Sequence, residues 1–157
     1  MKAVLGWLVL LGLILGFSAW GCGLPPDCKT MAGFPVYDNT GRLDCGAVDL
    51  GVVALVNTLG YGRRALEDGG LEVLFEDALP PPECTSASAA GCYYGYTGQA
   101  YVWLPGDGCV ANSAFQHELL HHIFAYRDHD SDHDHVRPEW RGELAEAHAM
   151  SYAAEGC

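Results

Sequence analysis

The chain has 157 residues, half of them apolar, which is enough for one compact domain with a core of its own. Its formal net charge is -12, from 20 acidic and 8 basic residues, and such a surface repels nucleic acid. A nucleic-acid-binding protein is therefore excluded, whereas a peptide or protein substrate and a metal cation are compatible with the charge.

The first 21 residues predict an export signal peptide. Lys2 is followed by an apolar run up to Trp20, and small residues precede Cys22. The stretch from Ser18 to Cys22 resembles the signal of bacterial lipoproteins, in which the cysteine becomes a lipidated N-terminus. This resemblance implies a lipid anchor on the membrane and a place in the bacterial cell envelope. Plain secretion and an uncleaved membrane anchor are the alternatives. All three place the domain outside the cytoplasm.

The cysteines support export. Of the seven in the chain, Cys22 is set aside as the lipidation site, and six cysteines in a short exported domain predict up to three disulfides. No spacing is Cys-x-x-Cys, which argues against thiolate ligands to a metal. The sequence alone does not fix the pairing. We favour pairs of neighbours along the chain: Cys28 with Cys45, Cys84 with Cys92, and Cys109 with Cys157.

Residues 22–44 are rich in Pro, Gly, Asp and Asn without periodicity, and predict a tether followed by an irregular N-terminal segment. The folded domain is expected over residues 45–157. Apolar residues between Ala47 and about Leu66 recur near helical spacing and predict a first helix, which its glycines weaken.

Short strands are expected next. Residues 71–75 are mostly apolar, and residues 78–90 form a proline-rich loop. The aromatic and β-branched stretches 93–96 and 100–104, separated by a turn, predict two further strands. A second helix follows, where Ser113 and Gln116 form a capping box. That helix is apolar on most sides, so it is buried. An acidic, histidine-rich loop and a C-terminal helix beginning near Pro138 complete the domain.

The segment His-Glu-Leu-Leu-His from His117 to His121 carries the chemistry. Two histidines four residues apart on a helix project from the same face, so two imidazole nitrogens can reach one tetrahedral ion. Glu118 then lies near the open coordination position, where it can take a proton from water. This is the zincin signature. It predicts Zn2+ on His117 and His121, with Glu118 as the general base.

A catalytic zinc ion takes three protein ligands, and His135 is our choice for the third. The Asp- and His-rich stretch that ends there, followed by Pro138 and Trp140, resembles the segment after the motif in small zincin-like bacterial proteins. The resemblance covers residues 113–140. The chain departs from the metzincin pattern, because the glycine and histidine expected soon after His121 are absent. The alternatives for the third ligand are Glu143 or Glu146, as in gluzincins, and His129, His133 or an aspartate.

These observations together predict an α+β, zincin-like domain: a first helix, a small and mostly antiparallel sheet, the active-site helix and a C-terminal helix. The resemblance implies zinc-dependent hydrolysis of a peptide or protein substrate. The alternative is a non-catalytic metal-binding module outside the cytoplasm, either an inactive zincin-like domain or a calcium-binding one.

The calcium alternative rests on the loop 128–139. Asp128, Asp130, Asp132 and Glu139 occupy the positions of EF-hand ligands 1, 3, 5 and 12. His133 stands where the sharp turn of that loop requires glycine. Zinc on the helix motif is therefore the preferred cofactor, with calcium in this loop as a second reading.

Overall fold

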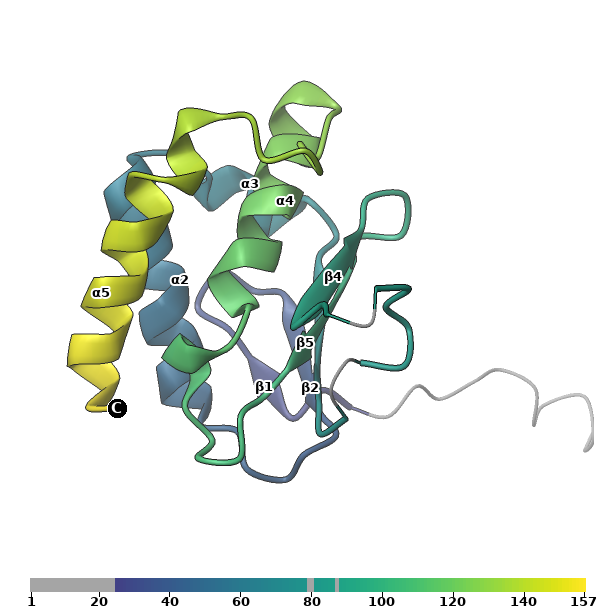
Figure 1. Cartoon of the computed structure of the whole chain (residues 1–157), viewed down its shortest axis with the longest axis vertical. Coiled ribbons are helices and arrows are strands. Elements are labelled where there is room, and N and C mark those ends of the chain that lie inside the picture. The colour runs from purple at the N-terminus through teal and green to yellow at the C-terminus, as the bar shows by residue number, and fades with distance from the viewer. Residues whose placement is uncertain (1–24, 79–80, 87) are drawn as a thin grey trace, which may run out of the picture.

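The computed structural model describes residues 25–78, 81–86 and 88–157 (Figure 1). The predicted signal peptide and the predicted lipidation site at Cys22 lie outside these residues. Within the described part, none of the helices combines the length and the apolar character that crossing a bilayer requires.

A five-stranded mixed sheet forms among the described residues, in the order β1-β2-β3-β5-β4. The outer pairs, β1 with β2 and β4 with β5, are antiparallel, whereas β3 runs parallel to both β2 and β5. The prediction of a mostly antiparallel sheet was therefore wrong, although the α+β class is confirmed. The strands are β1 (Cys28–Lys29), β2 (Pro35–Asp38), β3 (Glu72–Glu76), β4 (Gly91–Tyr94) and β5 (Gln99–Trp103).

Two of these strands, β1 and β2, lie in the stretch that we expected to be irregular. The parallel pairing explains the error, because β2 and β3 are neighbours in the sheet but are separated along the chain by two helices. The three strands predicted further along the chain are confirmed, with boundaries shifted by one or two residues.

The helices gather on one side of the sheet (Figure 1). The predicted first helix is broken in two, because Gly60 takes up a left-handed conformation with φ 70° and ends α2. The helices are α2 (Cys45–Leu59), α3 (Arg63–Asp68), α4 (Phe115–Asp128) and α5 (Glu143–Glu155), with short 3-10 helices at Val110–Asn112 and Pro138–Trp140.

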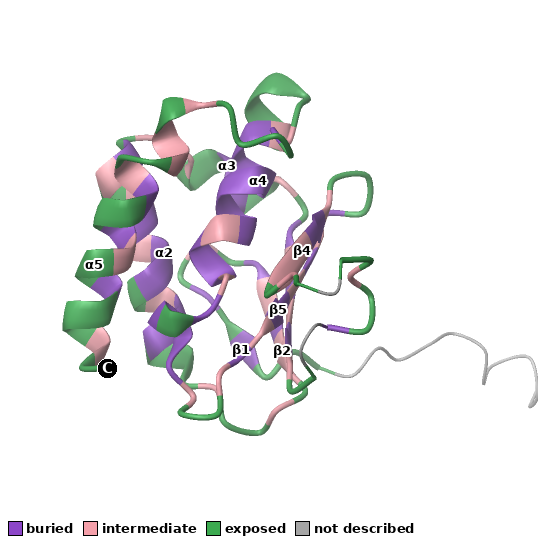
Figure 2. Cartoon of the chain, in the orientation of Figure 1, coloured by how far each residue is buried: buried purple, intermediate pink, exposed green. Residues whose placement is uncertain are grey.

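The core lies between the sheet and α4, and α4 is buried along most of its length (Figure 2). Alternate strand residues such as Val73, Phe75 and Val102 are fully buried, as expected for a sheet with one covered face. Gly51 of α2 lets Phe115 approach, because a Cβ at position 51 would lie 3.1 Å from that ring. Burial of these apolar surfaces is the main stabilising contribution, and it fixes α4 against the sheet.

The predicted capping box does not form. Ser113 Oγ accepts a hydrogen bond from the backbone N–H of Phe115, but the Gln116 side chain turns away from the helix end. Its Nε2 instead donates to the carbonyl oxygen of Gly51 in α2 at 2.8 Å and contacts Ser151 Oγ of α5 at 2.8 Å. Gln116 therefore links three helices in the interior.

The described residues contain three disulfides, and they follow the neighbour pairing: Cys28–Cys45, Cys84–Cys92 and Cys109–Cys157. The first joins β1 to the start of α2, and the last joins the end of α5 to the segment before α4. Three disulfides in a domain of this size indicate a protein that resides outside the cytoplasm.

Candidate metal centre

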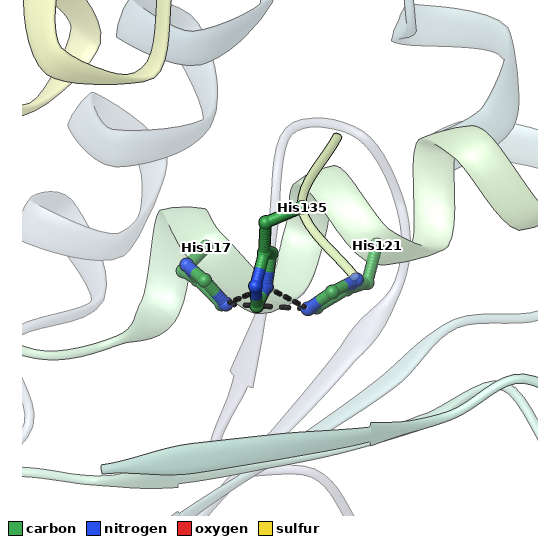
Figure 3. Close-up of side chains that lie close together, drawn as sticks. All are labelled: His117, His121 and His135. Carbon is green, nitrogen blue, oxygen red and sulfur yellow. Dashed lines mark hydrogen bonds between the residues drawn. The ribbon is translucent and has the colours of Figure 1, made fainter. Parts of the chain in front are cut away.

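Three histidines meet beside α4 (Figure 3). His117 and His121 stand one helical turn apart, with their Nε2 atoms 3.2 Å from each other. His135 comes from the loop after α4, and its Nε2 lies 3.1 Å from that of His117 and 3.3 Å from that of His121. The structure thus brings together the three residues that the sequence suggested as ligands.

The triangle has the dimensions of a metal site. Ligand nitrogens at 2.0–2.1 Å from a tetrahedral ion lie about 3.3–3.4 Å from one another, close to the distances observed here. Hydrogen bonding does not account for the arrangement. His121 Nδ1 lies 2.6 Å from the carbonyl oxygen of Ser131 and carries the ring proton, so its Nε2 offers only a lone pair. Each of the other two Nε2 atoms is either a donor or an acceptor, so at most two of the three contacts can be hydrogen bonds.

Burial keeps the imidazoles of His117 and His121 neutral. Loss of contact with water, together with the neighbouring histidines, lowers the pKa of His117 to about 3. The same burial lowers the pKa of His121 to about 4, although its hydrogen bond to Ser131 acts in the opposite direction. At neutral pH both rings therefore present lone pairs, which is the form that binds a metal ion.

Glu118 is buried on the same helix, and its side chain borders the cleft. Burial raises its pKa to about 8, and no hydrogen bond or ion pair from the described residues offsets the rise. A divalent cation on the three histidines would lower this pKa and favour the carboxylate. Gly91 of β4 makes room for the side chain, because a Cβ there would lie 2.7 Å from Glu118 Oε1. Sequence reasoning gave Gly91 no role.

The cleft in front of the histidines has a volume of about 760 Å³. Strand β4 and the segment closed by the Cys84–Cys92 disulfide form one wall, and the residues before α4 form another. His148 of α5 also lines the cleft. The sequence alone did not distinguish His148 from a surface histidine.

Strand β4 borders the cleft, whereas no residue of β5 lines it. β5 is paired on both sides, with β3 and with β4, whereas β4 is the edge of the sheet. The N–H of Trp103 donates to the carbonyl oxygen of Ala90, so these two residues form a hydrogen-bonded pair of the antiparallel ladder. The alternation of that ladder directs the backbone N–H and C=O of Gly91 and Tyr93 away from β5, to the open edge of the sheet, and both residues line the cleft.

The other proposed third ligands do not join the triangle. His133 lines the same cleft, with its ring 5.1 Å from that of His121, but it is not part of the group. His129, Glu143 and Glu146 are likewise not among the metal-binding groups of the described residues.

The carboxylates of the proposed calcium loop do not converge within the described part of the chain. Asp128 pairs with two arginines, and Asp132 accepts hydrogen bonds from N–H groups of its own loop. Glu139 accepts a hydrogen bond from Tyr61. Because these carboxylates are engaged by protein groups, the described residues lend no support to the calcium alternative for loop 128–139.

Comparisons with models of known protein families, with curated proteins and with solved structures found no match. The protein is therefore characterised by its fold and its candidate site alone. It is a disulfide-linked α+β domain with a three-histidine group that could hold a metal ion.

The stability of the chelator-treated protein is expected to depend on pH through Glu118. The unfolded carboxyl titrates near 4.5, whereas the folded one keeps its proton up to about 8, so the free energy of unfolding falls as pH rises through this window. Glu118→Gln removes that contribution. As pH rises through this window, the free energy of unfolding of the variant should therefore increase relative to that of wild type, by at most about 1.4 kcal/mol per pH unit. Urea unfolding at about pH 5 and about pH 8 measures the difference, and equal values at both would contradict the prediction.

Proposed function

We propose that this protein is an exported, zinc-dependent peptide hydrolase. The observation that carries the proposal is the triangle of Nε2 atoms on His117, His121 and His135, which opens on a cleft that Glu118 also borders. Export is supported by the three disulfides. A lipid anchor at Cys22 remains part of the proposal, based on the sequence signal.

The donor set supports zinc. Three imidazole nitrogens suit Zn2+ among the common metal ions, and three protein ligands with an open position are typical of catalytic rather than structural zinc. When bound, zinc lowers the pKa of a water molecule and polarises the carbonyl group of the substrate. The three histidines would hold the ion on the cleft side of α4.

Glu118 is the general base of the proposed reaction. As a carboxylate it takes a proton from the attacking water, and it then delivers that proton to the nitrogen of the leaving amine as the peptide bond breaks. An extended peptide would lie along β4, with hydrogen bonds to the free backbone groups of Gly91 and Tyr93. This edge of the sheet runs beside the Glu118 carboxylate, since Gly91 lies against Glu118.

Metal analysis and hydrolysis assays test the proposal together. The purified protein should hold about one zinc ion per chain, the number that one three-histidine site accepts. It should cleave an unfolded polypeptide, a chelator should abolish the cleavage, and added Zn2+ should restore it. His129→Asn, which changes an exposed histidine outside the triangle to a residue that tolerates its left-handed backbone, is the matched control and should behave as wild type.

The competing function is a metal-binding module without turnover. It is favoured if zinc is retained in the expected amount but no unfolded polypeptide or peptide mixture is cleaved. Purified protein that takes up no zinc would contradict both functions.

A further inference from the structure

Trp140 lies against all three candidate ligands. The centroid of its ring is 4.8 Å from that of His117, 4.7 Å from that of His121 and 4.5 Å from that of His135. The same side chain packs edge-on against Phe124 of α4, at 5.6 Å between ring centroids. One indole thus touches every imidazole of the triangle and ties the group to the helix that carries two of them.

Asp132 fixes the position of that indole. Its buried carboxylate accepts a hydrogen bond from the Trp140 indole N–H at 2.5 Å and one from the backbone N–H of Arg137 at 3.1 Å. The backbone N–H of Val136 donates to the other carboxylate oxygen at 3.4 Å. Both amides immediately follow His135, so a single carboxylate holds the backbone on the C-terminal side of this histidine and the aromatic ring beside it.

The loop that carries His135 needs such support. His129, Asp132 and His135 all adopt left-handed backbone conformations, with φ of 57°, 53° and 53°, which residues other than glycine rarely occupy. Such conformations persist only where the surroundings enforce them. The same loop presents the carbonyl oxygen of Ser131 to Nδ1 of His121, and this contact orients the second ligand.

We infer that Asp132 is a positioning residue which, through Trp140 and the backbone amides around His135, holds the third histidine in place on the two histidines of α4. The inference rests on the proposed function, since it concerns the same metal centre. Ser131, whose carbonyl oxygen lies 2.6 Å from Nδ1 of His121, directly precedes Asp132 in the same loop. The third ligand thus depends on one buried carboxylate that has no place in the triangle itself.

Asp132→Asn tests this inference. The amide keeps the size of the side chain, but its NH2 group would face N–H donors that now bond to carboxylate oxygens. The zinc dissociation constant, measured by competition with a chromogenic chelator, is expected to rise by a factor of about 10–100. Asp134→Asn is the matched control: it changes an exposed carboxylate of the same loop and should leave zinc affinity unchanged.

Cobalt substitution adds a readout that overall stability would not move. With Co2+ in place of zinc, the wild-type protein should show the intense visible absorption of a four-coordinate ion. Asp132→Asn should show a weaker spectrum, because His135 leaves and water takes its place. An unchanged spectrum together with unchanged zinc affinity would overturn the inference and leave the proposed function intact. Failure of the wild-type protein itself to bind either metal would instead overturn the proposed function.

Trp140→Phe keeps the inference testable should the Asp132 variant fail to fold. It retains a smaller aromatic ring against the histidines and removes the indole N–H that donates to Asp132. Zinc affinity should fall by about tenfold, the lower end of the range for groups that orient ligands. Wild-type affinity in a folded Trp140→Phe protein would show that the contact does not position the site.

Discussion

Peptide hydrolysis is expected to fall by a factor of about 10²–10⁴ when Glu118 is replaced by glutamine, while zinc content stays at one ion per chain. Glutamine has the same shape but cannot take a proton from water. It also fits the space that Gly91 leaves beside this side chain. The change therefore removes the base without disturbing the histidines. Turnover of an unfolded polypeptide and elemental analysis of the same samples measure the two effects.

A matched control separates the role of Glu118 from that of acidic residues in general. Glu146 is exposed on α5 and was one of the alternative third ligands suggested by the sequence. Glu146→Gln should retain both zinc and activity, since His135 completes the triangle. Loss of zinc in that variant would return Glu146 to the list of ligands. Hydrolysis at the wild-type rate in Glu118→Gln would remove Glu118 from the mechanism.

Much of the site was predictable because its central part is local. Two histidines at i and i+4 must share a face of any helix, and the apolar residues around them predicted that helix and its burial. Figure 3 shows the result: His117 and His121 point to the same place. His135 was harder, because its position depends on a loop with three left-handed residues. Nothing in the local pattern indicated that Asp132 holds this loop.

What escaped prediction is non-local. Strand β2 has four residues, one of them proline, and exists because it pairs with β3 across a helical crossover. Gln116 has the spacing of a capping box, yet partners in α2 and α5 compete successfully for its side chain. Trp140 lies where the C-terminal helix was expected to begin, whereas it packs against the three histidines of the candidate site. In each case a residue far along the chain decides the outcome.

The second large effect is expected on stability, from the disulfide between Cys109 and Cys157. It closes 48 residues of chain, the longest of the three closures among the described residues. In the chain-entropy account, cross-linking a loop of this length stabilises the folded state by about 4 kcal/mol. Replacing both cysteines with serine should lower the free energy of unfolding by that order, as measured by urea denaturation.

The same replacement should leave the metal centre intact, because its ligands come from α4 and the following loop rather than from α5. The end of α5 keeps a second attachment there: the Glu155 carboxylate accepts hydrogen bonds from the backbone N–H groups of Val110 and Ala111, at 2.7 and 2.8 Å. Zinc affinity of the serine variant at low temperature should therefore match that of wild type. A loss of zinc in the folded variant would show that α5 supports the histidines directly.

Removal of the Cys84–Cys92 disulfide is the informative comparison, because it should destabilise the fold less but weaken substrate binding more. This bond closes only 8 residues, so its loss should cost about 2.5 kcal/mol on the same account. Its segment, however, forms a wall of the cleft beside Glu118. The serine variant should be less destabilised than that of Cys109 and Cys157, yet bind substrate more weakly, with a raised KM and unchanged zinc content. Equal KM values in the two variants would mean that the disulfide-closed segment does not contact the peptide.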